Sequence, residues 1–171
     1  MSRARSLLLF GGLGLAAFGM LFGLYYAIFV EHQTLDKMGG SLAAAFVHAA
    51  ERDWGKSEAE LVIYSETKYD YVRQVDVHSH WIGLAMLMIV LGVVFDEVAF
   101  RERVRLWIAL ALLIGSGLFP LGVILQTARF ELFGSVLAIG GSGLVIASLS
   151  IIAVGFARQK QLSYSEERRI C

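Results

Sequence analysis

Four long apolar stretches, separated by polar ones, divide the chain. Each is long enough to cross a hydrocarbon core ~30 Å thick, which takes roughly 20 helical residues. The stretches are residues 7–30, 77–95, 106–125 and 132–157, and none contains Lys, Arg, Asp or Glu. An unbroken apolar run must be helical in lipid, because its backbone finds no other hydrogen-bond partner there. The pattern therefore predicts the all-α fold class, as an integral membrane four-helix bundle.

Composition agrees with a single membrane domain over residues 1–171. The chain is 57% hydrophobic and its mean hydropathy is +0.64, which leaves too little polar surface for a soluble domain of this length. The net charge is zero, so no basic surface for nucleic acid is indicated. The one cysteine, Cys171, excludes a framework of disulfides within the chain.

Residues 31–76 form the only long polar segment. The pair Gly39-Gly40 predicts a break, after which Ser41 is a possible N-cap for a short amphipathic helix over residues 41–52. The apolar face of that helix would be Leu42, Ala45, Phe46 and Ala49. We expect this helix to lie along the membrane surface or to cap the bundle. Residues 61–64 are expected to be a short extended piece.

Small residues recur at four-residue spacing in two of the apolar stretches. Gly19 and Gly23 have the spacing that lets two membrane helices approach closely, and so do the three residues Gly134, Ala138 and Ser142. We expect both stretches to pack tightly against a neighbour. Pro120 is expected to kink the third helix.

The basic residues predict the orientation of the chain. Nine of its 15 Lys and Arg residues lie before the first stretch, between the second and third, and after the fourth. Because short cytoplasmic flanks carry an excess of Lys and Arg, both termini are predicted to be cytoplasmic. Residues 31–76 and 126–131 then lie outside, together with all four histidines.

The residues that open the second stretch are the main candidates for chemistry. His78 and His80 stand just before the apolar run from Trp81. On a regular helix they would point about 200° apart, so both can reach one ion only if His78 is extended and Asp76 caps the helix. The alternatives are a ligand pair, an interfacial structural role, and a proton relay or pH sensor.

A cofactor site would need further ligands. His32 follows the first stretch, and we expect it at the depth of His80 if the first two helices are neighbours. Two imidazoles facing each other across a bundle suit axial ligation of haem b, or part of a copper or zinc site, and arginines would pair with haem propionates. The candidate cofactor-binding residues are His80, His78, His32, Arg73 and Arg129, and the candidate metal ligands are His78, His80, His32 and His48.

The stretch Gly23-Leu24-Tyr25-Tyr26, followed by the His78-Ser79-His80 opening with Gly83, resembles a group of small uncharacterised four-helix bacterial membrane proteins. These in turn look like a fragment of the haem–copper oxidase and nitric oxide reductase core subunit. The resemblance implies the bacterial inner (plasma) membrane, and haem b or a metal near the outer face with His78 and His80 as matching positions. The chain departs from the pattern, because it has a long insert over residues 33–76 and no histidine after His80.

Taken together, these features predict a membrane-embedded subunit that binds haem b or a metal such as copper, transfers electrons, and has no catalytic activity of its own. The alternative is a non-catalytic accessory or assembly subunit of a larger membrane complex. A small transporter or channel is a third hypothesis, which the lack of charge within the apolar stretches disfavours. The expected partners are the lipid bilayer and either other membrane subunits or further copies of the chain.

Overall fold

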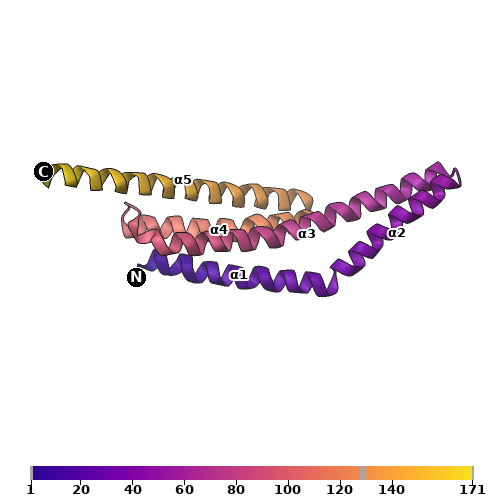
Figure 1. The fold of residues 1–171 in the computed structure, drawn as a ribbon, viewed down its shortest axis with the longest axis horizontal. Coiled ribbons are helices and arrows are strands. Elements are labelled where there is room, and N and C mark those ends of the chain that lie inside the picture. The colour runs from indigo at the N-terminus through magenta and orange to yellow at the C-terminus, as the bar shows by residue number, and fades with distance from the viewer. Residues whose placement is uncertain (1, 128–129, 171) are drawn as a thin grey trace.

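A computed structural model describes the backbone of residues 2–127 and 130–170, and the side chains of those residues up to 161. Every element that it describes is helical (Figure 1). The elements are α1 (Arg3–Phe29), α2 (Glu31–Ala50), α3 (Trp54–Val94), the 3-10 turn η1 (Phe95–Glu97), α4 (Glu102–Thr127) and α5 (Glu131–Ile170). The all-α class is confirmed, and α1, α3, α4 and α5 contain stretches long and apolar enough to cross a membrane.

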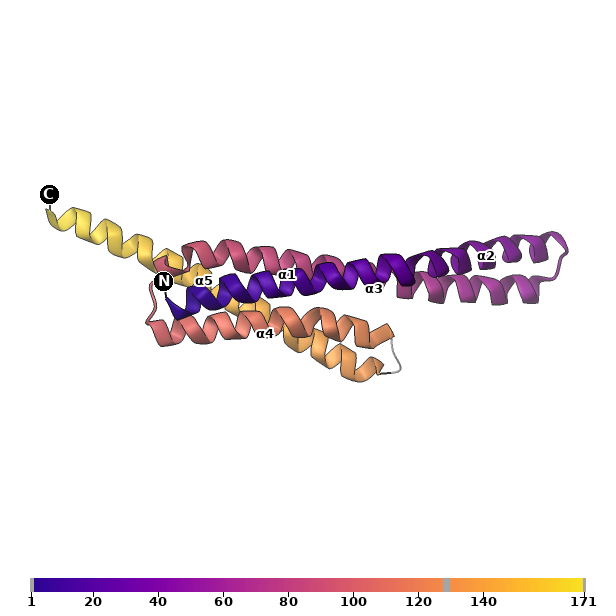
Figure 2. The ribbon, with the colours of Figure 1, turned by 90° about the horizontal axis from the view of Figure 1, so that it is seen from below.

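A two-helix arm projects from the bundle of apolar helices (Figures 1 and 2). We name it the stalk, and it consists of α2 and residues 54–75 of α3. α2 follows α1 after the single residue Val30, whose φ of −121° and ψ of −43° mark the break. The 20 residues of α2 make the stalk ~30 Å long. The prediction of a short helix that caps the bundle is therefore wrong.

The glycine pair at 39–40 does not interrupt α2. A glycine inside a helix costs about 1 kcal/mol relative to alanine, and the alanine-rich residues 43–45 and packing against α3 offset this cost. Ser41, expected as an N-cap, lies inside the helix and is buried. Its hydroxyl donates to the carbonyl of Met38 at 3.2 Å. Contacts between helices thus overrode the local signal.

α3 is one helix that runs from the tip of the stalk through the bundle. At the tip, Arg52 has a φ of 63°, and the Asp53 side chain accepts the Lys56 backbone N–H at 3.2 Å. The Lys56 ammonium lies 2.8 Å from the same carboxylate, and this bond holds the pKa of Asp53 below its ordinary value. Residues 61–64 are helical rather than extended, and Asp76 lies in mid-helix rather than at a cap.

Within the bundle, α1 packs closely on α3, and α4 packs closely on α5. Glycines permit both contacts. A Cβ on Gly19 would lie 3.0 Å from the Trp81 Cβ of α3, and one on Gly134 would lie 2.7 Å from the Gly122 carbonyl oxygen of α4. The predicted close approach through small residues is confirmed for both helix pairs. α4 continues past Pro120 to Thr127.

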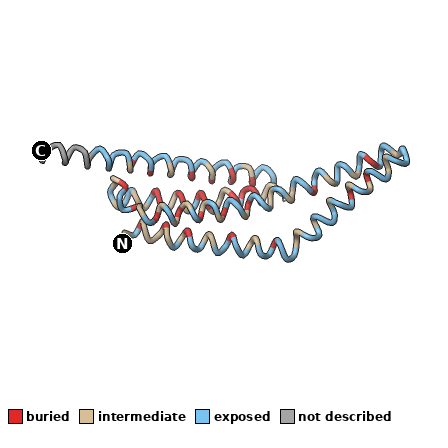
Figure 3. The backbone as a smooth tube through the Cα atoms, viewed as in Figure 1, coloured by how far each residue is buried: buried red, intermediate tan, exposed pale blue. Residues whose placement is uncertain are grey.

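The core lies where α1, α3 and α4 meet, and α5 adds Val145 and Ile152 to it (Figure 3). Leu8, Met88, Phe95 and Leu112 are fully buried there. The stalk, by contrast, is mostly exposed (Figure 3).

Ion pairs tie together the end of the bundle that holds both chain ends (Figure 1). Arg5 of α1 lies 3.5 Å from the Asp96 carboxylate of η1. Arg105 of α4 lies 3.6 Å from the same carboxylate and 2.9 Å from that of Glu102. The starts of α1 and α4 are thereby fixed to the end of α3.

Candidate functional site

His78 is packed against the backbone of α1. Its Nδ1 lies 2.9 Å from the carbonyl oxygen of Gly19, so the Nδ1–H tautomer donates a hydrogen bond to that helix. A Cβ on Gly23 would collide with the imidazole ring. The Gly19 and Gly23 spacing thus makes room for this side chain, which is half-buried between two helices.

His80 points toward a different helix. Its ring meets the Phe119 ring of α4 edge-on, with 4.8 Å between ring centres. Its Nδ1 lies 2.6 Å from the carbonyl oxygen of Asp76, one turn earlier in α3. Because α3 is helical through this region, the extended geometry at His78 that would join the two imidazoles at one ion is absent. The structure therefore does not bring the two rings together.

His32 is not at the depth of His80. α2 continues outward from α1 and runs antiparallel to α3. Glu31, the residue before His32, therefore lies level with Tyr71, and the Tyr71 hydroxyl is 3.4 Å from the Glu31 carboxylate. Tyr71 is about nine residues before His80, which is roughly 14 Å along a helix. The side chain of His32 is 86% exposed and lies 3.4 Å from the Asp36 carboxylate. The expectation of equal depth is wrong, because it required the chain to turn at the end of α1.

The remaining candidate residues lie apart from these histidines. His48 is near the tip of the stalk, 3.5 Å from the Glu51 carboxylate. The guanidinium of Arg73 lies over the Tyr69 ring, 4.9 Å from its centre. Arg129 falls outside the described residues. Among the residues that the structure describes, no three of His, Cys, Asp and Glu are grouped as a metal would require.

The feature that sequence reasoning missed is the seam of the stalk, along which its two helices meet. The seam residues recur at intervals of three and four, as in a coiled coil. They are Thr34, Met38, Ser41, Ala45 and His48 of α2, and Ser57, Glu60, Tyr64, Thr67 and Tyr71 of α3. Near the tip of the stalk the buried Ser57 hydroxyl donates to the Ala45 carbonyl at 3.0 Å. Most of these residues are small or polar, so the seam gains little hydrophobic stabilisation.

The large apolar side chains of the stalk lie outside this seam, with Phe46 70% and Trp54 68% exposed. The seam of an antiparallel helix pair separates two flanks. Each flank is formed by the same heptad positions of both helices. One flank, which we name the apolar flank, carries Leu35, Leu42, Phe46, Leu61, Val72 and Val75. The other, the polar flank, carries mainly Gln33, Lys37, Glu51, Lys56, Glu66, Asp70 and Arg73, and its exposed apolar residues are Val47 and Ile63.

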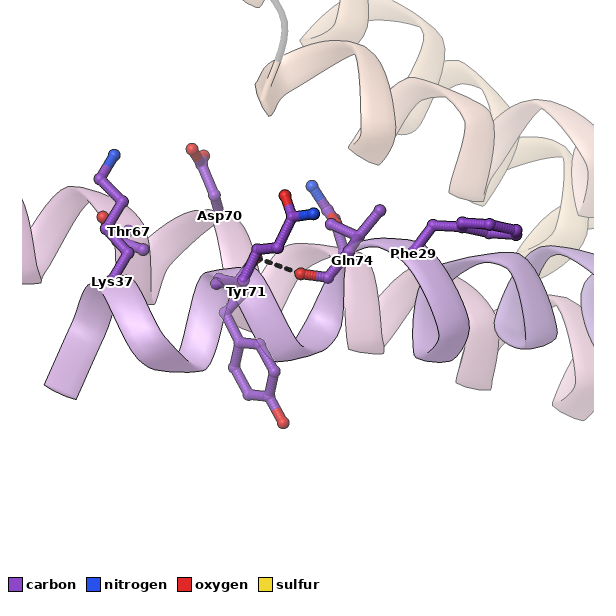
Figure 4. A pocket seen from close by; sticks show the side chains of 9 residues that line it. Phe29, Lys37, Thr67, Asp70, Tyr71 and Gln74 are labelled. Atoms are coloured by element: carbon purple, nitrogen blue, oxygen red, sulfur yellow. Dashed lines mark hydrogen bonds between the residues drawn. The ribbon is translucent and has the colours of Figure 1, made fainter.

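A shallow hollow at the base of the stalk brings Gln33 and Lys37 of α2 to the same side as Asp70 of α3, as the polar flank requires (Figure 4). It is lined by residues of both helices, among them Lys37 of α2 and Asp70 of α3. Figure 4 shows these two side chains pointing to the same side of the hairpin, whereas the Tyr71 ring points away from it. The Thr34 hydroxyl donates to the carbonyl of Val30, the residue before α2, at 2.9 Å.

The comparisons with known proteins give no match: neither a family, nor a curated protein, nor a solved structure is similar to the chain. The resemblance to the haem–copper oxidase core therefore receives no support from them. The arrangement of the described residues is the basis for assigning a function.

Proposed function

We propose that the protein is a non-catalytic accessory or assembly subunit of a larger membrane complex, and that the stalk is its docking element. One observation carries the proposal, namely that the stalk places its apolar residues outward and its small and polar residues in the seam. Proteins rarely expose contiguous apolar patches that have no partner. The pattern is therefore expected of a stalk whose apolar flank is covered by another protein surface.

The apolar part of the molecule offers a second surface for a partner. An apolar groove runs between α4 and α5, lined by Val104, Trp107, Ile108, Ala111, Leu144, Ala147, Ser148 and Ile151. Trp107 is 72% exposed, and a Cβ on Gly140 or Gly143 of α5 would meet open space. Small residues on a free helix face favour contact with another membrane helix. This surface supports a place for the chain beside other membrane subunits.

The orientation that we propose follows from the ends of the chain. An even number of spans places both ends on one side, and that end of the bundle carries Arg3, Arg5, Arg101, Arg103 and Arg105. The excess of arginine favours the cytoplasmic side. The stalk then stands on the outer side of a bacterial inner membrane, where a partner with an outer domain is within its reach.

Haem or metal binding stays a prediction. The geometry of the described residues gives it less support than the docking role, because His78 contacts α1, His80 contacts α4 and His32 is exposed. Arg129 and any ligand from a partner lie beyond the described residues. If haem b is present, His80 remains the ligand to test.

The proposed function predicts the size and the colour of the protein purified in mild detergent. Light scattering with chromatography should give a protein mass well above the 18.8 kDa of one chain, because a docking subunit leaves the membrane with its partner. The absorption spectrum should lack a Soret band, and metal analysis should find no stoichiometric copper. A stable, fully folded monomer would contradict the docking role, whereas a Soret band lost in His80→Ala would favour the haem alternative.

A further inference from the structure

We infer that the apolar flank of the stalk is covered by the same flank of a second copy of this chain, so that two stalks form a four-helix bundle outside the membrane. The inference rests on the proposed docking role and names the partner. Its basis is the distribution of side chains around the stalk, in which one flank carries most of the large apolar residues and the other carries most of the charged ones.

An isolated stalk lacks the core that a pair of helices needs. The residues buried in its seam are Ser41, Ala45, Ser57 and Thr67, none of which carries a large apolar side chain. Two-helix pairs of this size draw most of their stability from buried apolar faces. Placing two apolar flanks together supplies that core, because it puts leucine, valine and phenylalanine side chains inside a four-helix arrangement.

The membrane makes a second copy the best-matched occupant. Copies inserted in the same orientation hold their stalks parallel, at the same height and on the same side. A two-fold axis along the membrane normal then brings each apolar flank against its own equivalent, as a self-complementary interface requires. A second stalk also matches the length of the flank, which runs from Phe46 near the tip to Val75 near the bundle.

The exposed area suits an interface of ordinary size. Leu35, Phe46, Leu61, Val72 and Val75 are between 37% and 70% exposed. An aromatic side chain such as that of Phe46 buries ~150–250 Å², and leucine and valine are somewhat smaller, so these residues and Leu42 offer on the order of 500 Å² per copy. A stable interface buries ~800 Å² per partner, so backbone and neighbouring side chains of the stalk would supply the remainder.

Few charged residues of the stalk lie at this interface. Glu58 and Lys68 are the charged residues that the heptad pattern places on the apolar flank. The Lys68 ammonium lies 5.8 Å from the centre of the Tyr64 ring, and a lysine stem can cover apolar surface while its charge stays in water. Glu60 lies in the seam, and the other charges lie on the polar flank or the outer side of the stalk, which would face solvent in the dimer.

Cysteine cross-linking in native membranes tests the inference. In the full chain with Cys171→Ser, we compare Leu61→Cys on the apolar flank with Ile63→Cys on the polar flank. These positions lie two residues apart on α3 and are 47% and 37% exposed. A short bis-maleimide should join the Leu61→Cys chains into a dimer of about twice 18.8 kDa, with at least ~10-fold less product for Ile63→Cys, because side chains two apart on a helix point in nearly opposite directions.

Each other outcome overturns the inference in a recognisable way. Equal dimer yields from the two variants would mean random collision. A product of Leu61→Cys with a different protein would show that the flank docks a foreign partner, which refutes the second copy but keeps the proposed function. No product from either variant, with both cysteines reactive toward a monofunctional maleimide, would mean that the flank is uncovered and would refute both proposals.

Discussion

Gly122→Val is expected to separate α4 from α5 and to lower the free energy of unfolding by about 3 kcal/mol. A Cβ at Gly122 would collide with the backbone nitrogen of Ala138 and would lie 2.7 Å from the carbonyl oxygen of Gly134. Backbone atoms cannot turn aside as a side chain can, so the two helices would have to move apart. Thermal unfolding of the purified protein in detergent measures the effect.

The matched control is Gly117→Val in the same helix. A Cβ at Gly117 would have no neighbour within 4 Å, and valine has a somewhat better helix propensity than glycine. We expect its unfolding midpoint to stay close to that of the wild type. Equal losses for the two variants would contradict the close backbone contact between α4 and α5.

Phe95→Ala is expected to cost about 3–5 kcal/mol, the range for removing a buried phenylalanine side chain. Phe95 is fully buried at the turn between α3 and α4, in one cluster with Ala4, Leu8 and Val98. The cavity left by alanine would weaken the end of the bundle where α1, α3 and α4 join. The same unfolding measurement applies.

Phe10→Ala serves as the comparison for this cavity. Phe10 belongs to α1 and is 70% exposed, so the change removes an aromatic ring without opening a hole in the core. A loss of less than about 1 kcal/mol is expected, as for surface substitutions away from packing features. A loss as large as that of Phe95→Ala would show that the core lies elsewhere.

Sequence patterns predicted the apolar helices well, because one physical requirement decides them. A run without charge must satisfy its own backbone in lipid, and the four predicted runs match stretches of α1, α3, α4 and α5 to within one residue at the ends of α1 and α3. The contacts at Gly19, Gly23, Gly134 and Ala138 were also predictable, since a small residue every four positions opens a groove along one helix face.

The outer segment was predicted poorly because no single physical requirement decides its structure. Gly39, Gly40 and the polar run to Asp76 carry local signals for breaks, and these were overridden by contacts between residues distant in the chain, such as Ser57 with Ala45. The seam left a signal in the sequence, its small and polar residues at three- and four-residue intervals. A search for apolar faces misses it, because here the seam is the less apolar side.

The candidate histidine site depended on two assumptions about the path of the chain. One was that the helix begins after His78, and the other was that the chain turns at the end of α1. Both fail because α3 is a single helix and α2 continues outward from α1. The sequence showed that His78 and His80 are the polar residues at this depth. Only the structure showed that they point in different directions, His78 toward α1 and His80 toward α4.

Amide hydrogen exchange of the stalk in membranes tests the central claim that a protein surface covers it. We predict that peptides within residues 35–69 exchange as slowly as those of α4, because a buried four-helix arrangement opens rarely. In the double variant Phe46→Glu with Leu61→Glu the same peptides should exchange much faster, while α4 is unchanged. Rapid exchange of the wild-type stalk, equal to that of the variant, would contradict the account.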